Sequence, residues 1–162
     1  METLTKWPTN KPAELHSFFG KFQLGDDGRP TTGWETTFLT QISTPFRVRL
    51  AWCPDVSINR ITCHREVTSS LHRILGEILN HFGSPEEVKK AGYDLLGGAY
   101  QFRTACGSHK LSMHAYGAAI QLGPLRHPKH ERTDADEAVD KIFSDEGWSW
   151  LGAAEGWGAI DL

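Results

Sequence analysis

The stretch TSSLHRILGEILNHFG, residues 68–83, constrains the fold more than any other part of the sequence. Its apolar side chains recur at the spacing of one helix face: Leu71, Ile74, Leu75, Ile78, Leu79 and Phe82. Thr68 or Ser69 is available as the N-cap, and Gly83 as the terminator. The pattern predicts an amphipathic helix whose apolar face packs on a core.

Weaker patterns before and after this helix predict a mixture of strands and further helices. Residues 46–52, FRVRLAW, alternate apolar and basic side chains, which is typical of a half-buried strand with Arg47 and Arg49 facing water. Helices are expected over residues 84–92 and 134–147, and strands over residues 97–107, which begin with a glycine pair, 115–122, 148–150 and 158–162. This order lacks the regular alternation of a doubly wound sheet. We therefore expect an α+β fold with a small, mainly antiparallel sheet flanked by helices.

The chain of 162 residues has a net charge of −3, with acidic and basic side chains interspersed. No basic field gathers phosphates, which excludes nucleic acid as an expected partner. No stretch reaches the roughly 18 apolar residues that a membrane span requires, and the first residues contain no apolar signal-peptide core. We expect a soluble protein synthesised in the cytoplasm, without a signal peptide or a membrane span.

Residues 97–124, GGAYQFRTACGSHKLSMHAYGAAIQLGP, contain an ordered set of residues typical of one enzyme family. They resemble the central motif of the zinc D-alanyl-D-alanine carboxypeptidases and L-alanyl-D-glutamate endopeptidases. These enzymes share the Hedgehog/DD-peptidase fold, and the likeness is greatest to their phage endolysin branch. In that family an Arg after a strand is followed by Ser-x-His-x-x-Gly-x-Ala-x-Asp. The matching residues here are Arg103, Ser112, His114, Gly117 and Ala119.

The resemblance extends beyond this motif and suggests a domain boundary. Upstream, TPFRVRLAW and RITCHREV fit the family, and downstream EGWSW resembles the family's Gly-Trp-x-Trp strand. The resemblance therefore implies a peptidase-like domain over residues 44–162. Residues 1–43 are rich in Pro, Gly, Thr and Asp, and we expect them to form an N-terminal arm or wrapping segment.

The family's chemistry implies a zinc ion held by a His and an Asp of the central motif and by a second His near the C-terminus. An acidic residue three positions before that second His is the general base on the zinc-bound water, and the Arg stabilises charge on the substrate carbonyl. Here His114 matches the first ligand, but Gln121 stands where the family has Asp. Gly158 and Asp161 stand where it has the base and the last His. The resemblance thus implies a degraded metal site with vestigial catalytic positions, and no cofactor is expected.

Other chemical arrangements of these residues stay open. A rearranged metal site would combine His114 and Asp161 with one of three further histidines, His109, His127 and His130. Cys106 could be a nucleophile with His109 or His114 as its base, and Glu155 could stand in as an acid or base.

The vestigial catalytic positions Arg103, Ser112 and Gly158 also have purely structural interpretations. Arg103 would then pair with a carboxylate such as Asp161. Ser112 would only hydrogen-bond the backbone near His114.

Two functional hypotheses follow from the resemblance. The first is a pseudopeptidase, a non-catalytic relative encoded by a phage or prophage and used as a binding or virion structural module. Its partners would be other virion or assembly proteins, or the peptidoglycan stem peptide. The alternative is an active zinc peptidoglycan endopeptidase or carboxypeptidase, an endolysin with an altered ligand set, in which His114 and Asp161 bind metal and Gln121 assists. A third possibility is a groove that binds stem peptide through Arg103 without cutting it.

Overall fold

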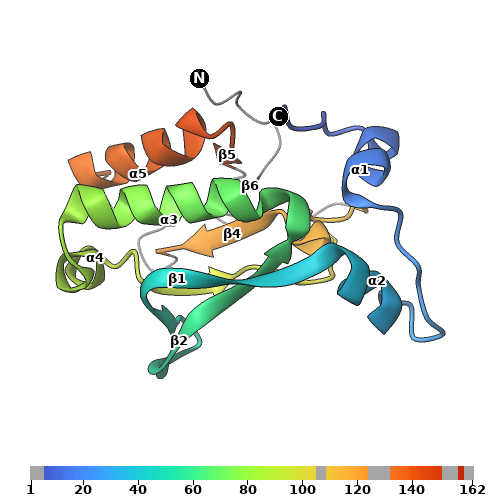
Figure 1. The fold of residues 1–162 in the computed structure, drawn as a ribbon, viewed down its shortest axis with the longest axis horizontal. Helices are drawn as coiled ribbons and strands as arrows, with labels where there is room; N and C mark the ends of the chain where they lie inside the picture. The colour runs from blue at the N-terminus through green and yellow to red at the C-terminus, as the bar shows by residue number, and fades with distance from the viewer. Residues whose placement is uncertain (1–5, 105–108, 124–131, 151–156, 159–162) are drawn as a thin grey trace.

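Helix α3, Thr68–Phe82, lies over one face of the sheet and beside α5, as Figure 1 shows. The computed structural model describes residues 6–104, 109–123, 132–150 and 157–158. The predicted apolar face of α3 is confirmed: four of its side chains are fully buried, and two are partly buried against the core. The four are Leu71, Ile74, Leu75 and Ile78, and the two are Leu79 and Phe82.

The two ends of α3 differ in how well the sequence predicted them. Gly83 ends the helix in the left-handed conformation at φ 90°, as expected. The predicted N-cap is wrong, because Thr68 is already the first helical residue and Val67 occupies the cap position without a side-chain hydrogen bond. The 3-10 turn η1, Arg65–Val67, leads directly into the helix, and the Thr68 hydroxyl donates to the Arg65 carbonyl instead.

The six-stranded sheet has the order β2-β1-β3-β4-β6-β5. The strands are β1 Leu39–Leu50, β2 Cys53–His64, β3 Leu95–Gly98, β4 Ala119–Leu122, β5 Ser149–Trp150 and β6 Trp157–Gly158. Every neighbouring pair is antiparallel except β1 and β3, which are parallel. The predicted α+β fold with a mainly antiparallel sheet is therefore confirmed.

Strand β1 alternates between its two faces, as the sequence pattern predicts. Ile42, Phe46 and Val48 are buried, and Arg47 is exposed. Arg49 does not simply face water, because its guanidinium forms two hydrogen bonds, of 2.5 and 2.8 Å, with the carboxylate of Asp94. Asp94 is only 3% exposed, so this ion pair is part of the packing at the start of β3.

Two predicted strands are shorter than expected. The glycine pair Gly97 and Gly98 ends β3 instead of beginning a strand over residues 97–107. Likewise, β4 starts only at Ala119, because Met113–Tyr116 form the 3-10 turn η2 and Gly117 reverses the chain at φ 72°. Both corrections have the same origin, since glycines at these places end regular pairing.

The remaining predicted elements in the described residues match the structure. Helix α4, Pro85–Ala91, has the expected Ser84 cap, and α5, Asp134–Asp145, begins with a capping box formed by Thr133 and Asp136. The predicted strand over 148–150 is β5. Of the predicted strand over 158–162, only Gly158 belongs to the described residues, where it ends β6.

The N-terminal segment supplies helices α1, Pro12–Phe19, and α2, Thr32–Phe38, at the end of the molecule away from α4 (Figure 1). Leu15 and Phe19 belong to the same buried cluster as the helix and sheet residues. Strand β1 runs without interruption across positions 43 and 44, where we had divided the arm from the domain.

His64 joins the N-terminal segment to the sheet. Its Nε2 donates to the Phe19 carbonyl at 2.7 Å, and its Nδ1 accepts the Glu66 N–H at 3.1 Å. Its own main-chain N–H donates to the Gly117 carbonyl at 2.7 Å. The ring is buried among Phe19 and Phe38, and this burial lowers the pKa of His64 below its ordinary value.

A search of the helices over the described residues found none that is both long and apolar enough to span a membrane.

Gly117→Ala should destabilise the fold. Alanine would have to adopt φ +72°, which residues with a side chain rarely do, and its Cβ would lie 2.8 Å from the His64 main-chain nitrogen. We expect the free energy of unfolding, measured by urea denaturation, to fall by about 2 to 4 kcal/mol. Gly76→Ala is the matched control, because nothing lies within 4 Å of its added Cβ inside α3. That change should raise the stability by up to about 1 kcal/mol, and equal losses in both variants would contradict the packing described.

The stability of the protein should fall as the pH drops below about 6.5, the ordinary pKa of His. The folded state holds His64 neutral with a lowered pKa, so the unfolded chain binds its proton first. The contribution of this residue is complete above about pH 6.5 and is lost as the pH falls toward the folded pKa. In His64→Gln, which keeps a donor and an acceptor but does not titrate, the slope of unfolding free energy against pH should be smaller between pH 5 and 7. An unchanged slope would contradict this role.

Candidate functional site

The motif residues from Ser112 onward are arranged by the turn η2. The Ser112 hydroxyl accepts the His114 N–H at 3.2 Å and so caps the turn. The Ser112 N–H donates to the Arg103 carbonyl at 3.0 Å, which ties the turn to the segment that follows β3. The hydrogen bond between Ser112 and the backbone at His114, which the structural interpretation expects, is present.

His114 is 1% exposed, and its ring is fixed by one short contact. Nδ1 lies 2.6 Å from the Ala99 carbonyl oxygen. Because a carbonyl can only accept, Nδ1 must carry the proton, and in the neutral ring the lone pair belongs to Nε2. Histidines that bind metals are commonly held in this way by a backbone carbonyl, and the same contact equally satisfies a buried histidine with a structural role.

Gln121 lies on β4 beside the same segment. It pairs across the ladder with Gly98, and its side chain covers Gly97, where an added Cβ would be 2.7 Å from the Gln121 Oε1. Its neighbours Ile120 and Leu122 are buried in the core, so the side chain of Gln121 points to the opposite face of the sheet. His114 and Gln121, which match the family's His and Asp ligands, therefore contact the same short segment, Gly97 to Ala99.

Arg103 and Gly158 complete the described part of the motif. The Arg103 Nε donates to the Gln101 Oε1 at 3.4 Å, and its Nη1 donates to the Thr104 carbonyl at 3.2 Å. Gln101 in turn donates its N–H to the His114 carbonyl at 3.0 Å. Gly158 lies on β6 opposite Ala119, two residues from Gln121 along β4. The five motif positions in the described residues thus belong to, or directly contact, neighbouring segments of β3, η2, β4 and β6.

The side chains described here do not form a zinc site. His114 is oriented as a ligand would be, but Gln121 offers only a neutral amide oxygen, which cannot balance the charge of zinc. Among residues 6–104, 109–123, 132–150 and 157–158, no group of three His, Cys, Asp or Glu side chains is placed to hold a metal ion. His109 is exposed. The other residues of the alternative sites lie outside the described residues: Cys106, His127, His130, Glu155 and Asp161.

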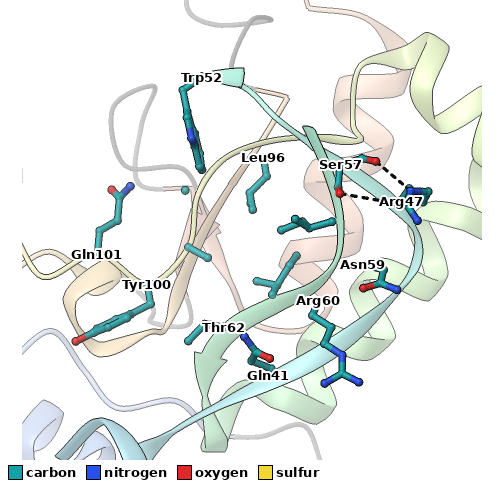
Figure 2. Close-up of a pocket in the computed structure, with 14 residues that line it drawn as sticks. Gln41, Arg47, Trp52, Ser57, Asn59, Arg60, Thr62, Leu96, Tyr100 and Gln101 are labelled. Atoms are coloured by element: carbon teal, nitrogen blue, oxygen red, sulfur yellow. Dashed lines mark hydrogen bonds between the residues drawn. The ribbon is translucent and has the colours of Figure 1, made fainter. Parts of the chain in front are cut away.

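A groove that the sequence analysis missed lies between β2 and the segment Leu96–Gln101, and encloses about 690 Å³. Figure 2 shows Tyr100 and Gln101 on one side and Ser57, Asn59 and Arg60 on the other, with Leu96 between them. The groove adjoins the motif, because Ala99, whose carbonyl holds the His114 ring, is one of its lining residues. The sequence indicated this side of the sheet only through FRVRLAW, whose alternate residues were expected to be exposed.

The groove carries positive charge. Arg47 and Arg60 line it, and no Asp or Glu is found among its lining residues in the described part of the chain. The Arg47 guanidinium is held by the Ser57 hydroxyl at 3.0 Å and the Ser57 carbonyl at 3.4 Å. Burial raises the pKa of Tyr100 to about 12, and the nearby Glu35 carboxylate adds to the shift. The phenol of Tyr100 therefore stays protonated and is a hydrogen-bonding group here, not a base.

Comparison with protein-family models, with curated proteins and with solved structures found no match to this chain. The assignment to the zinc peptidases therefore stays a hypothesis, which depends on the quoted motif residues.

The placement of Gln121 over Gly97 can be tested with a double-mutant cycle. Gly97→Ala should lower the free energy of unfolding by about 1 to 3 kcal/mol, because the new methyl group overlaps the Gln121 side chain. In a Gln121→Ala background the same change should be nearly neutral. We expect a coupling energy above about 1 kcal/mol, measured by urea denaturation of the four proteins. Additive effects would show that the two side chains do not meet.

Proposed function

We propose that this protein is a pseudopeptidase, a non-catalytic relative of the zinc peptidases that cleave peptidoglycan, and that its groove binds a ligand instead of cutting it. The observation that carries the proposal is the neutral Gln121 on β4, at the position where the family has a charged zinc ligand. Without that charge, and with Gly158 in place of the general base, the site cannot generate a metal-bound hydroxide in the family's way.

Apart from Arg103, the motif residues that match the family have structural roles in this fold. Ser112 caps η2, Gly117 provides the positive φ that ends it, and Ala119 is buried where β4 begins. The His114 ring bridges to the Ala99 carbonyl. Gln121 and Gly158 differ from the family at the positions of a zinc ligand and of the general base. This division supports a scaffold kept for its shape after its chemistry was lost.

The resemblance to phage endolysins supports a phage or prophage origin for the chain. In this setting a cell-wall hydrolase fold serves as a binding or structural module of the virion. Its partners are then other virion or assembly proteins, or the peptidoglycan stem peptide.

One observation favours the alternative, an active zinc peptidase with an altered ligand set. The contact between His114 Nδ1 and Ala99 leaves the lone pair on Nε2, which is the form that binds zinc. In this alternative, His114 and Asp161 bind the metal and Gln121 assists.

Metal content and cleavage decide between the two functions. We expect purified protein to contain no stoichiometric zinc by plasma mass spectrometry, and to release no fragments from peptidoglycan when zinc is added. Gln121→Asp should raise zinc affinity, because it restores an anionic oxygen, and His114→Ala is the control that removes the imidazole. One zinc per chain that is lost in His114→Ala, together with stem-peptide cleavage, would establish the active enzyme instead.

A further inference from the structure

Strand β2 is an edge of the sheet, and part of its outer side faces the groove. In the described residues it pairs only with β1. The His64 N–H donates to the Gly117 carbonyl and therefore points away from β1. Along a strand, every second residue directs its N–H and C=O groups to the same side. By the register of the ladder, Thr62 and Arg60 also direct their N–H and C=O groups outward. Both residues line the groove.

The groove has the shape that an added strand needs. The outer edge of β2 forms one wall, and the segment Leu96–Gln101 forms the other (Figure 2). Its volume of about 690 Å³ lies in the general range of ligand pockets in proteins. Gly117 already supplies one main-chain partner to the outer side of β2, at His64. A ligand strand would continue this pairing along Thr62 and Arg60.

Charge selects the kind of strand that fits. Among the described residues that line the groove, Arg47 and Arg60 are the charged ones, so acidic side chains would be attracted and basic ones repelled. A second copy of this chain is a poor occupant, because pairing two β2 edges would bring two arginine-bearing rims together. Trp52, 64% exposed at the groove, offers an aromatic surface to apolar residues of the ligand.

We propose that the groove binds an extended, acidic segment of a partner polypeptide as an additional strand on β2, hydrogen-bonded to the main chain at Arg60 and Thr62. This inference rests on the proposed function only in taking the groove as a site of binding without cleavage. Strand addition gives affinity through the main chain, and the arginines give selectivity for acidic side chains.

The test uses fluorescein-labelled peptides and fluorescence anisotropy with the full chain. The probe is acetyl-Val-Glu-Val-Glu-Val-Glu-Val-amide, and its control replaces every Glu with Lys. We expect at least tenfold tighter binding of the Glu peptide, with the difference shrinking as salt is added. Two further peptides carry N-methyl groups on either the Val or the Glu residues. Only one of the two should lose binding, because alternate N–H groups of an added strand face β2.

Variants of the protein locate the site. Arg60→Glu should weaken binding of the Glu peptide at least tenfold, whereas Lys89→Glu, the same charge change on α4 outside the groove, should not. Thr62→Pro removes an outward N–H without touching the ladder to β1, so it should weaken binding and leave the fold intact. If Thr62→Pro fails to fold, the N-methylated peptides still test the main-chain contact.

Several results would overturn the inference. They are equal binding of the Glu and Lys peptides, no binding of either, no effect of Arg60→Glu, or loss of binding with both or neither of the N-methylated peptides. A synthetic stem peptide that displaces the Glu peptide, or a dimer broken by Arg60→Glu, would assign the groove to a different occupant. These failures leave the proposed function standing if zinc and cleavage are absent. Zinc-dependent cleavage would end the proposed function whatever the peptides do.

Discussion

The hydrogen bond from the His64 N–H to the Gly117 carbonyl holds together the parts of this protein on which its site depends. It links the end of β2 to the turn that carries His114, and the ring of the same His64 is bonded to the Phe19 carbonyl of the N-terminal segment. Gly117 makes the approach possible, because any side chain there would collide with His64. Three segments that are distant in the sequence therefore meet at His64, which lies at the end of β2 and next to the turn that carries the motif.

The sequence predicted the elements whose signals are local. The apolar face of α3 and the helices α4 and α5 each depend on a few neighbouring residues, and each is present in the structure. The sequence failed where a distant partner decides. Arg49 alternates like a surface residue, yet a buried carboxylate 45 positions away holds its guanidinium. The strand expected over residues 97–107 ends at its glycine pair for a similar reason, since Gly97 must leave room for Gln121 of another strand.

The candidate site was predictable only in part: the sequence predicted the motif but not the groove, for a physical reason. The motif fixed which residues would lie near one another, and the described ones do adjoin in β3, η2, β4 and β6. The groove was not predictable, because its walls come from β2 and from residues after β3, and no spacing in the sequence relates Arg60 to Tyr100. Pocket walls of this kind arise from sheet topology, which short sequence patterns do not encode.

The exposed edge of β2 also has a consequence for the protein when it is alone. A long strand with unpaired main-chain groups is a template for indiscriminate self-association, and proteins commonly protect such edges with charge. Arg60 lies on this edge, and the Arg47 guanidinium reaches it from β1 at Ser57, so the side chains proposed to recognise a partner would also oppose the pairing of unbound copies. This protection is electrostatic and weakens at high ionic strength, where the Debye length shrinks to about 3 Å at 1 M. The same two guanidinium groups would therefore affect both the self-association of the protein and its choice of ligand.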